Sequence, residues 1–171
     1  MNGPPIRLAP LAVIALGCAL ASCLSSSPPA PAVRFFDALP EQRAVVSGRA
    51  VRLRFTGAPH LGQQFAVRVA ARELVFDPLH SWISAPTNLV EAAFEQATAA
   101  AGETIEVHVA RFEIDLTGDP LARVRLELRA AGRATQVVEG TAPAPGREPE
   151  AVAAAMAVAL GRAASAAVAK L

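Results

Sequence analysis

Apolar side chains occupy every second position over long stretches of the chain between residues 51 and 140. Successive side chains of a β-strand point to opposite faces, so each stretch predicts a strand that buries one face. The first two strands are expected at residues 51–56 and 65–70. We expect the second to continue from Glu73 to Phe76 and to stop at Asp77-Pro78. The chain is therefore constrained to build a sheet with one covered face.

A change of parity divides the next alternating region. The apolar residues of 105–109 and those of 112–116 fall on opposite parities, so a bulge or bend near Ala110-Arg111 is needed to keep both sets in the core. The sequence TGDP at residues 117–120 predicts a turn. Residues 124–128 alternate again, and a last strand is expected around Thr135 to Gly140. Long strands joined by short turns are antiparallel neighbours, so this half of the sheet is predicted to be a meander.

Two segments change from the strand period to the helical period. Residues 86–102 place Leu89, Val90 and Phe94 on one face, and Gly102 stands where a C-terminal cap belongs. The second segment, residues 150–171, is rich in alanine. Its inward-facing row is expected at Val152, Met156, Leu160, Ala163 and Ala167.

These elements together predict an α+β fold. The small side chains of the second helix permit close packing, while Arg162 and Lys170 interrupt its apolar character and argue against a membrane span. We expect a two-layer sandwich in which a mostly antiparallel sheet of about five or six strands carries both helices on one face.

Residues 1–22 have the features of a secretory signal peptide. Arg7 is their only charged residue, and the apolar run from Leu8 to Ala21 is shorter than the roughly 20 residues that span a bilayer. Leu20-Ala21-Ser22-Cys23 resembles a bacterial lipobox, so Cys23 is predicted to begin the mature chain and to carry acyl chains such as palmitate. Two alternatives stay open, namely an ordinary cleaved signal and an uncleaved membrane anchor.

The mature chain is expected to have two parts. Residues 23–32 comprise the lipidated cysteine and a flexible tether rich in serine and proline, and residues 33–171 form a single folded domain. Ser25 stands two residues after the cysteine, where lipoproteins retained in the inner membrane typically carry aspartate. We therefore expect the protein at the periplasmic face of the outer membrane.

Charge and cysteine content narrow the functional classes. The chain has 16 Lys and Arg against 15 Asp and Glu, and loss of Arg7 with the signal leaves a formal charge of zero. Such a balance lacks the basic excess of a nucleic-acid-binding domain. Cleavage removes Cys18 and lipid occupies Cys23, so no intrachain disulfide is predicted.

The sequence contains no strong catalytic or metal-binding motif. There is no Gly-x-Ser-x-Gly elbow, glycine-rich phosphate loop or His-Glu-x-x-His pair. Glu106 and His108 share a strand face, and Glu73, Asp77 and His80 lie close in sequence, but solvated polar faces explain both groups. We expect no enzymatic activity, no metal and no cofactor.

Phe76, His80 and Trp82 are the candidate partner-binding residues. Under one interpretation Phe76, Leu79 and Trp82 plug the end of the core; under the other, Trp82 and His80 lie on an exposed loop and anchor a partner, since tryptophan is frequent at binding hot spots. A second set of candidates is the arginines expected on outer sheet faces, which form a solvated surface or meet anionic headgroups or an acidic partner. They are Arg52, Arg54, Arg68, Arg123, Arg125 and Arg129.

Several segments together resemble the ABC-type transport auxiliary lipoprotein component family, the Pqi-type intermembrane transport lipoproteins. They are the lipobox, the Ser/Pro tether, RFFDALP, VRVAARELVFDPLHSWISAPTNLVEAAF and the closing alanine-rich helix. The most specific element is the order Phe76, Trp82, Pro86 before the first helix.

The resemblance implies an auxiliary or adaptor subunit of a transport system that moves lipids between membranes. Its implied partners are a periplasmic protein with a mammalian-cell-entry (MCE) domain and the associated ABC permease and ATPase, and a homo-oligomer is conceivable. The lipid anchor implies contact with a membrane, and no nucleic acid is expected. The alternative is a periplasmic carrier lipoprotein that holds a lipid in its own cavity.

Overall fold

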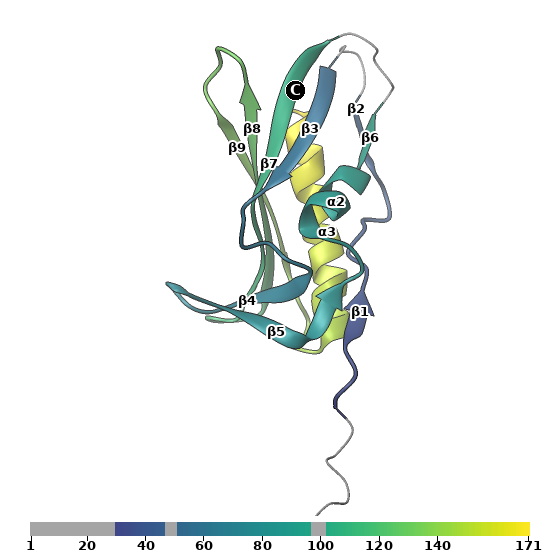
Figure 1. Cartoon of the computed structure of the whole chain (residues 1–171), viewed down its shortest axis with the longest axis vertical. Coiled ribbons are helices and arrows are strands. Elements are labelled where there is room, and N and C mark those ends of the chain that lie inside the picture. Colours follow the sequence, from purple (N-terminus) through teal and green to yellow (C-terminus); the bar gives the residue numbers. More distant parts are fainter. Residues whose placement is uncertain (1–29, 47–50, 97–101) are drawn as a thin grey trace, which may run out of the picture. The chain divides into compact units, whose positions relative to one another are not determined.

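One mixed sheet carries most of the folded unit, which spans Ala32–Leu171 (Figure 1). The computed structural model describes residues 30–46, 51–96 and 102–171, so the signal segment, Cys23 and the tether up to residue 29 lie outside the described residues. The strands are ordered β1, β5, β4, β7, β8 and β9, and β3 also pairs with β7. Their bounds are β1 (Arg34–Phe36), β3 (Val51–Gly57), β4 (Gln64–Ala70), β5 (Glu73–Trp82), β7 (Glu103–Asp115), β8 (Leu121–Ala130) and β9 (Gln136–Pro143).

The C-terminal half of the sheet is the antiparallel meander that the sequence predicts. β7 pairs with β8, and β8 pairs with β9. The register between β7 and β8 shifts between Val109 and Arg111, which confirms the bulge expected near Ala110-Arg111. Because of this shift, apolar residues of both parities are buried on one strand, namely Ile105, Val107, Val109, Phe112 and Ile114.

The N-terminal half departs from the sequence prediction. β3 and β4 both pair in parallel with the same edge of β7. β3 pairs with residues 103–109 of β7, and β4 pairs with residues 114–115. β5 continues through Asp77-Pro78, where the sequence predicted an end. The register of β4 with β5 shifts from the pair Phe65 and Asp77 to the pair Gln64 and Ser81, so residues 78–80 lie outside this ladder. Pro78 is tolerated there because no ladder bond from its nitrogen is required.

The first helix is shorter than predicted. α2 is Pro86–Ala92, and proline occupies its first turn. Phe94 begins strand β6 (Phe94–Gln96), which pairs in parallel with β2 (Ala44–Val46), and neither strand is predicted by the sequence pattern. The buried ring of Phe94 lies 5.5 Å from that of Phe55. This tertiary pairing overrides the helical period, so the prediction of a helix over residues 86–102 is wrong for residues 93–96, and residues 97–101 lie outside the described ranges.

The alanine-rich helix is confirmed as α3 (Pro149–Val168), and its predicted inward row is buried. Gly140 of β9 lies directly beneath it: a Cβ added there would come within 2.0 Å of the Ala159 carbonyl oxygen and 2.5 Å of the Ala163 nitrogen. Helix and strand backbones are therefore nearly in contact. Within the described part of the chain, α3 alone is long and apolar enough to cross a membrane, and half of its apolar window is buried in the unit.

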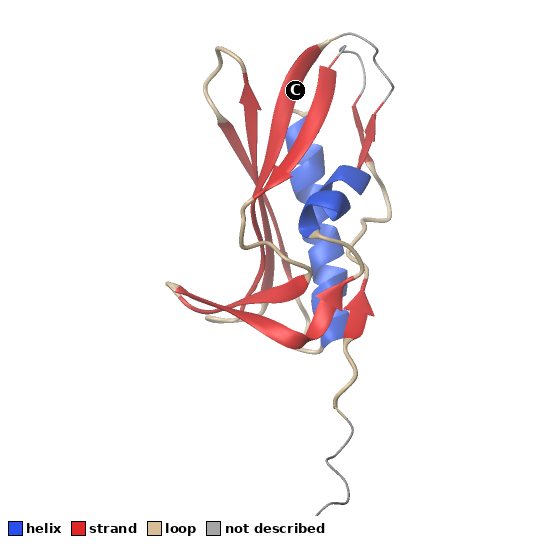
Figure 2. Cartoon of the chain, viewed as in Figure 1, coloured by secondary structure: helices blue, strands red, loops and turns tan. Residues whose placement is uncertain are grey.

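The predicted α+β sandwich is confirmed (Figure 2). α2 packs against β3 and β7, and α3 packs against β8 and β9. Residues from both helices and from the covered sheet face form one hydrophobic core. The sheet is mixed, because β1 with β5, β3 with β7 and β4 with β7 are parallel pairs.

Candidate functional site

Trp82, at the end of β5, belongs to an aromatic cluster in the core. It is 1 % exposed, its ring stacks on Phe65 with 4.0 Å between centroids, and it meets the edge of Phe112 at 5.3 Å. The ring of Phe36 on β1 lies 5.4 Å from Phe65. Trp82 therefore fills the core, and the interpretation that places it on an exposed loop is wrong.

Phe76 and Leu79 do not share this environment. Their side chains are 40 % and 37 % exposed, so the interpretation in which they plug the core together with Trp82 holds for Trp82 alone. The pattern of three large apolar residues on one strand gave no sign of this split, because the irregularity at residues 78–80 changes which face each residue occupies.

His80 lies at the border between the aromatic cluster and solvent. Its Nδ1 is 2.7 Å from Oδ2 of Asp77, and the imidazole is the donor because a carboxylate only accepts. The ring is 5.8 Å from that of Phe36 and 6.0 Å from that of Phe65. Burial opposes ionisation of Asp77, but hydrogen bonds from His80 and from the Leu79 backbone N–H outweigh it and lower the pKa of this carboxyl.

A cavity of about 220 Å³ opens beside this pair. Asp77, His80 and Arg147 supply its polar groups, and α3 closes it with Pro149 and Val152. The remaining lining is apolar and comes from Phe65, Val67, Ile114 and Leu116. Pockets for drug-sized ligands measure about 300–1,000 Å³, so this cavity fits a single small group and not a whole lipid. Arg147 stands in an irregular linker, and no sequence pattern singled it out.

Ion pairs cover the outer face of the sheet over β4 and β7. Arg68 donates to both carboxylate oxygens of Glu113 at 2.7 Å, and Glu113 is buried. The hydrogen bond to Glu113 raises the pKa of Arg68. Asp115 pairs with Arg123 at 2.9 Å. The hydroxyl of Thr117 lowers the Asp115 pKa most, and the Thr117 backbone N–H, Arg123 and Arg68 act in the same direction against the effect of burial.

The same arrangement continues across β8 and β9. Arg125 pairs with Glu139 at 3.0 Å, and Arg129 bridges Glu106 at 3.2 Å and Glu127 at 2.8 Å. These bonds favour the solvated-surface interpretation for the arginines of β4 and β8. Arg52 and Arg54 lie exposed on β3. The sequence contains a signal for these ion pairs. Like the arginines, the carboxylates stand at positions that alternate with the buried apolar residues of their strands.

The two groups considered as metal ligands do not assemble into a metal site. Glu106 and His108 both hydrogen-bond to the Thr56 hydroxyl, at 3.2 and 3.0 Å. Asp77 and His80 contact each other, and no third ligand-type side chain of the described residues joins them. Over residues 30–46, 51–96 and 102–171, no cluster of three or more His, Cys, Asp or Glu side chains is suited to a metal ion.

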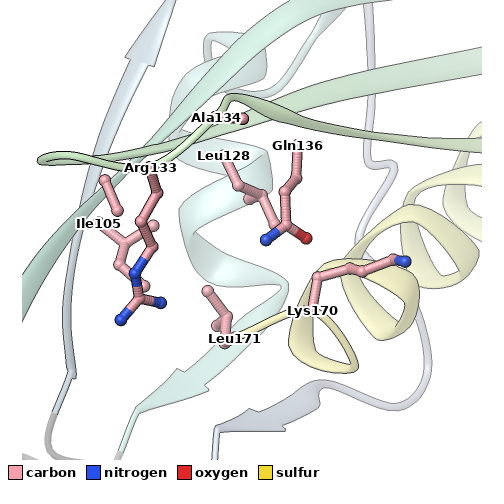
Figure 3. A pocket seen from close by; sticks show the side chains of 8 residues that line it. Ile105, Leu128, Arg133, Ala134, Gln136, Lys170 and Leu171 are labelled. Carbon is pink, nitrogen blue, oxygen red and sulfur yellow. The ribbon is translucent and has the colours of Figure 1, made fainter.

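Two other hollows differ sharply in size. A surface groove of about 830 Å³ runs between residues 39–42 and the outer side of α3, with Ala157, Gly161 and Arg162 among its lining. A hollow of about 10 Å³ separates the C-terminal Leu171 from the β8–β9 turn (Figure 3). The second is no larger than one water needs, so it is a packing gap and not a ligand site.

Comparisons with known proteins show the fold. No family model and no curated protein matches this chain. A Xanthomonas campestris protein of family DUF330, known from its crystal structure, is similar with a TM-score of 0.66 and 18% sequence identity over 80% of this chain and 93% of that chain. An uncharacterized protein of known crystal structure is similar with a TM-score of 0.54 and 12% identity over 81% of this chain and 95% of that chain. The α+β sandwich described above therefore also occurs in solved structures.

Proposed function

We propose that this protein is an outer-membrane lipoprotein, anchored through Cys23, that serves as the adaptor subunit of an MCE-type ABC transport system. Its folded body faces the periplasm and binds the MCE-domain component, which it ties to the outer membrane. It has no catalytic role of its own. The lipobox, the tether and the family resemblance of the sequence support this assignment.

The small cavity at the predicted site is the observation that favours an adaptor. A body that carries a membrane lipid needs an apolar cavity of several hundred Å³. The cavity beside His80 holds about 220 Å³, and α3 lies directly on the backbone of β9 at Gly140. A domain whose core leaves no room for a lipid is better suited to binding a protein partner than to carrying a lipid.

Purification of the full-length tagged chain from detergent-solubilised membranes tests the proposal. The adaptor assignment predicts that the MCE-domain protein co-purifies with the chain and that phospholipid is substoichiometric by mass spectrometry. A Cys23→Ala chain should lose its membrane attachment, which provides the control for the anchor. Absence of the MCE-domain protein from a preparation that retains the anchored chain would contradict the adaptor role.

The groove over α3 is the observation that supports the alternative, a lipid carrier. Its volume of about 830 Å³ falls within the range of ligand pockets. Charged and small residues share its lining, however, and it lies on the solvent side of the helix. One phospholipid bound per chain, lost when Ala157→Trp fills the groove, would favour the carrier over the adaptor.

A further inference from the structure

Large apolar side chains gather on the edge of the sheet formed by β1 and β5. Phe35 on β1 is 63 % exposed, and Ile83, which directly follows β5, is 61 % exposed. Four more apolar residues on or beside these strands are each more than a third exposed, and one of them, Val75, is left out of the patch because it has the strand parity opposite to Phe76. The five residues, named here the β1–β5 patch, are Val33, Phe35, Phe76, Leu79 and Ile83.

Strand register places the patch on one face, away from the core. Phe36 lies beside Trp82 in the parallel pairing, and both rings belong to the buried aromatic cluster. Phe35 lies beside Ser81, one residue earlier on each strand, so its side chain points to the opposite face. Ile83 keeps that parity and extends the ladder, because its N–H donates to the Phe36 carbonyl at 2.8 Å. Two other members of the patch share this parity, Val33 and Leu79.

Phe76 reaches the same face from the other side of the β5 irregularity. Phe65 of β4 faces the core and lies beside Asp77, whereas Ala66 lies beside Phe76. Neighbouring residues of a strand point in opposite directions, so Phe76 lies with Ala66 on the face opposite Phe65, where Ala66 is buried and Phe76 is 40 % exposed. Figure 1 shows β1 and β5 side by side where the chain enters the folded unit.

The five patch residues are uncharged, although Asp37 directly after β1 and Glu73 at the far end of β5 are exposed. Arg34, Asp77 and His80 have the opposite parity, and Arg34 pairs with Glu150 at the start of α3. On the neighbouring strand β4, Arg68 shares the outer face, but Glu113 holds its guanidinium. The patch therefore suits an apolar partner surface, and exposed apolar clusters of this kind mark contact sites.

The position of the patch along the chain indicates what covers it. Only the nine residues 24–32 separate Cys23 from Val33. Three of these nine residues are proline, and at the roughly 3.1 Å per residue of an extended proline-rich segment they span at most about 28 Å. A lipid on Cys23 would thus keep the β1–β5 edge close to a bilayer. The effective concentration of this edge at the membrane surface would then be high.

We propose that the β1–β5 patch rests on the lipid bilayer and inserts its side chains into the headgroup–acyl boundary of the membrane that holds the anchor. The inference rests on the lipid anchor of the proposed function and adds an orientation to it: the aromatic end of the body faces the membrane. An apolar face that lies at this depth supplements the acyl chains as a second membrane contact. Because the patch is uncharged, the contact does not require anionic lipids.

A fluorescent reporter on the full lipidated chain tests this orientation. The mature chain has no free thiol when Cys23 is acylated, so Ile83→Cys introduces the one site for a polarity-sensitive dye. Val137→Cys is the matched control, because Val137 is an exposed apolar residue on the same sheet face at the opposite edge, on β9. Each chain is reconstituted in phosphatidylcholine vesicles that contain a spin-labelled lipid quencher.

The inference predicts a blue-shifted dye at residue 83 that is quenched several-fold more strongly than the dye at residue 137. The difference should persist at about 1 M salt, where the Debye length is about 3 Å, since no charge pair holds the patch. Equal quenching at both sites on an acylated chain would overturn the inference alone. A blue shift without lipid quenching would also overturn it, because a second copy of the chain would then cover the patch. An unacylated product would overturn the proposed function and this inference with it.

Discussion

The two ends of the hydrophobic core are filled in different ways. Where α3 crosses β9, glycine and alanine let the two backbones approach until no room is left for even a methyl group at Gly140. At the other end, β1, β4 and β5 contribute the rings of Phe36, Phe65 and Trp82, and a cavity of about 220 Å³ remains beside them. One end is packed backbone to backbone, and the other is packed by large side chains.

This difference separates a rigid end from an end that can meet partners. Close-packed interiors tolerate little change in volume and offer no site for a ligand. The aromatic end borders the cavity, the Asp77–His80 pair and the β1–β5 patch, and the chain enters the folded unit there. The contact proposed for the β1–β5 patch thus belongs to the aromatic end, and the α3–β9 end is the most tightly packed part of the core.

The largest effect is expected from Trp82→Ala, which removes the centre of the aromatic cluster. Truncation of a buried aromatic ring costs about 3–5 kcal/mol in free energy of unfolding. Urea unfolding followed by far-ultraviolet circular dichroism measures it. Phe76→Ala, on the same strand but exposed, should change stability by no more than about 0.5 kcal/mol. Equal losses for the two variants would show that Trp82 is not part of the core.

Gly140→Ala challenges the other end directly. The added Cβ would overlap the Ala159 carbonyl, so α3 must move away from β9, and overpacking of this kind costs about 1–3 kcal/mol. The same unfolding measurement applies. Gly118→Ala is the matched control, because an added Cβ meets nothing within 4 Å there. A Gly140→Ala chain as stable as the control would contradict the backbone contact.

Acid sensitivity is expected from Asp115, which lies on the outer face where β7 ends. Its pKa is lowered in the folded state, mainly by the Thr117 hydroxyl, so its contribution to stability is complete above the ordinary aspartate value of about 3.9 and is lost as the pH falls through the lower folded-state value. Asp115→Asn should flatten this acid loss in unfolding measurements between about pH 5 and pH 2. Asp119→Asn, in the exposed turn nearby, serves as the control and should leave the loss in place.

The smallest effect is expected where the cavity has room. Val152→Ile adds one methylene beside the cavity of about 220 Å³, so stability should stay the same or rise by up to about 1 kcal/mol. Ala163→Val adds two methyl groups to a Cβ that lies next to Gly140. It should lower the free energy of unfolding by about 1–3 kcal/mol. Thermal unfolding compares the two. Equal losses would mean that both ends are packed alike.

The sequence predicts the C-terminal half of the fold well. The meander, the bulge at Ala110-Arg111 and the inward row of α3 all follow from local periodicity, because antiparallel neighbours and a helix are specified by residues close in the chain. The N-terminal half is less predictable. The parallel pairing of β3 and β4 with β7 and of β2 with β6 joins segments distant in sequence, and no periodicity reports such partners.

The candidate site is only partly predictable for the same reason. Alternation marked Phe76, Leu79 and Trp82 as apolar, but the irregularity at residues 78–80 decides which of them reaches the core. The cavity beside His80 forms from β4, β5, β7 and the start of α3, so no single segment carries its signature. Expectations for Cys23 depend on the sequence alone, since that residue lies outside the described ranges.

The central claim is that this body is held to a membrane by lipid on Cys23. Intact-mass analysis of the mature chain, extracted from the membranes of a bacterium that exports it, tests this most directly. The account predicts an N-terminus at Cys23 whose mass includes a diacylglycerol group and further acylation. A water-soluble product that begins at another residue, or an unmodified Cys23, would contradict it.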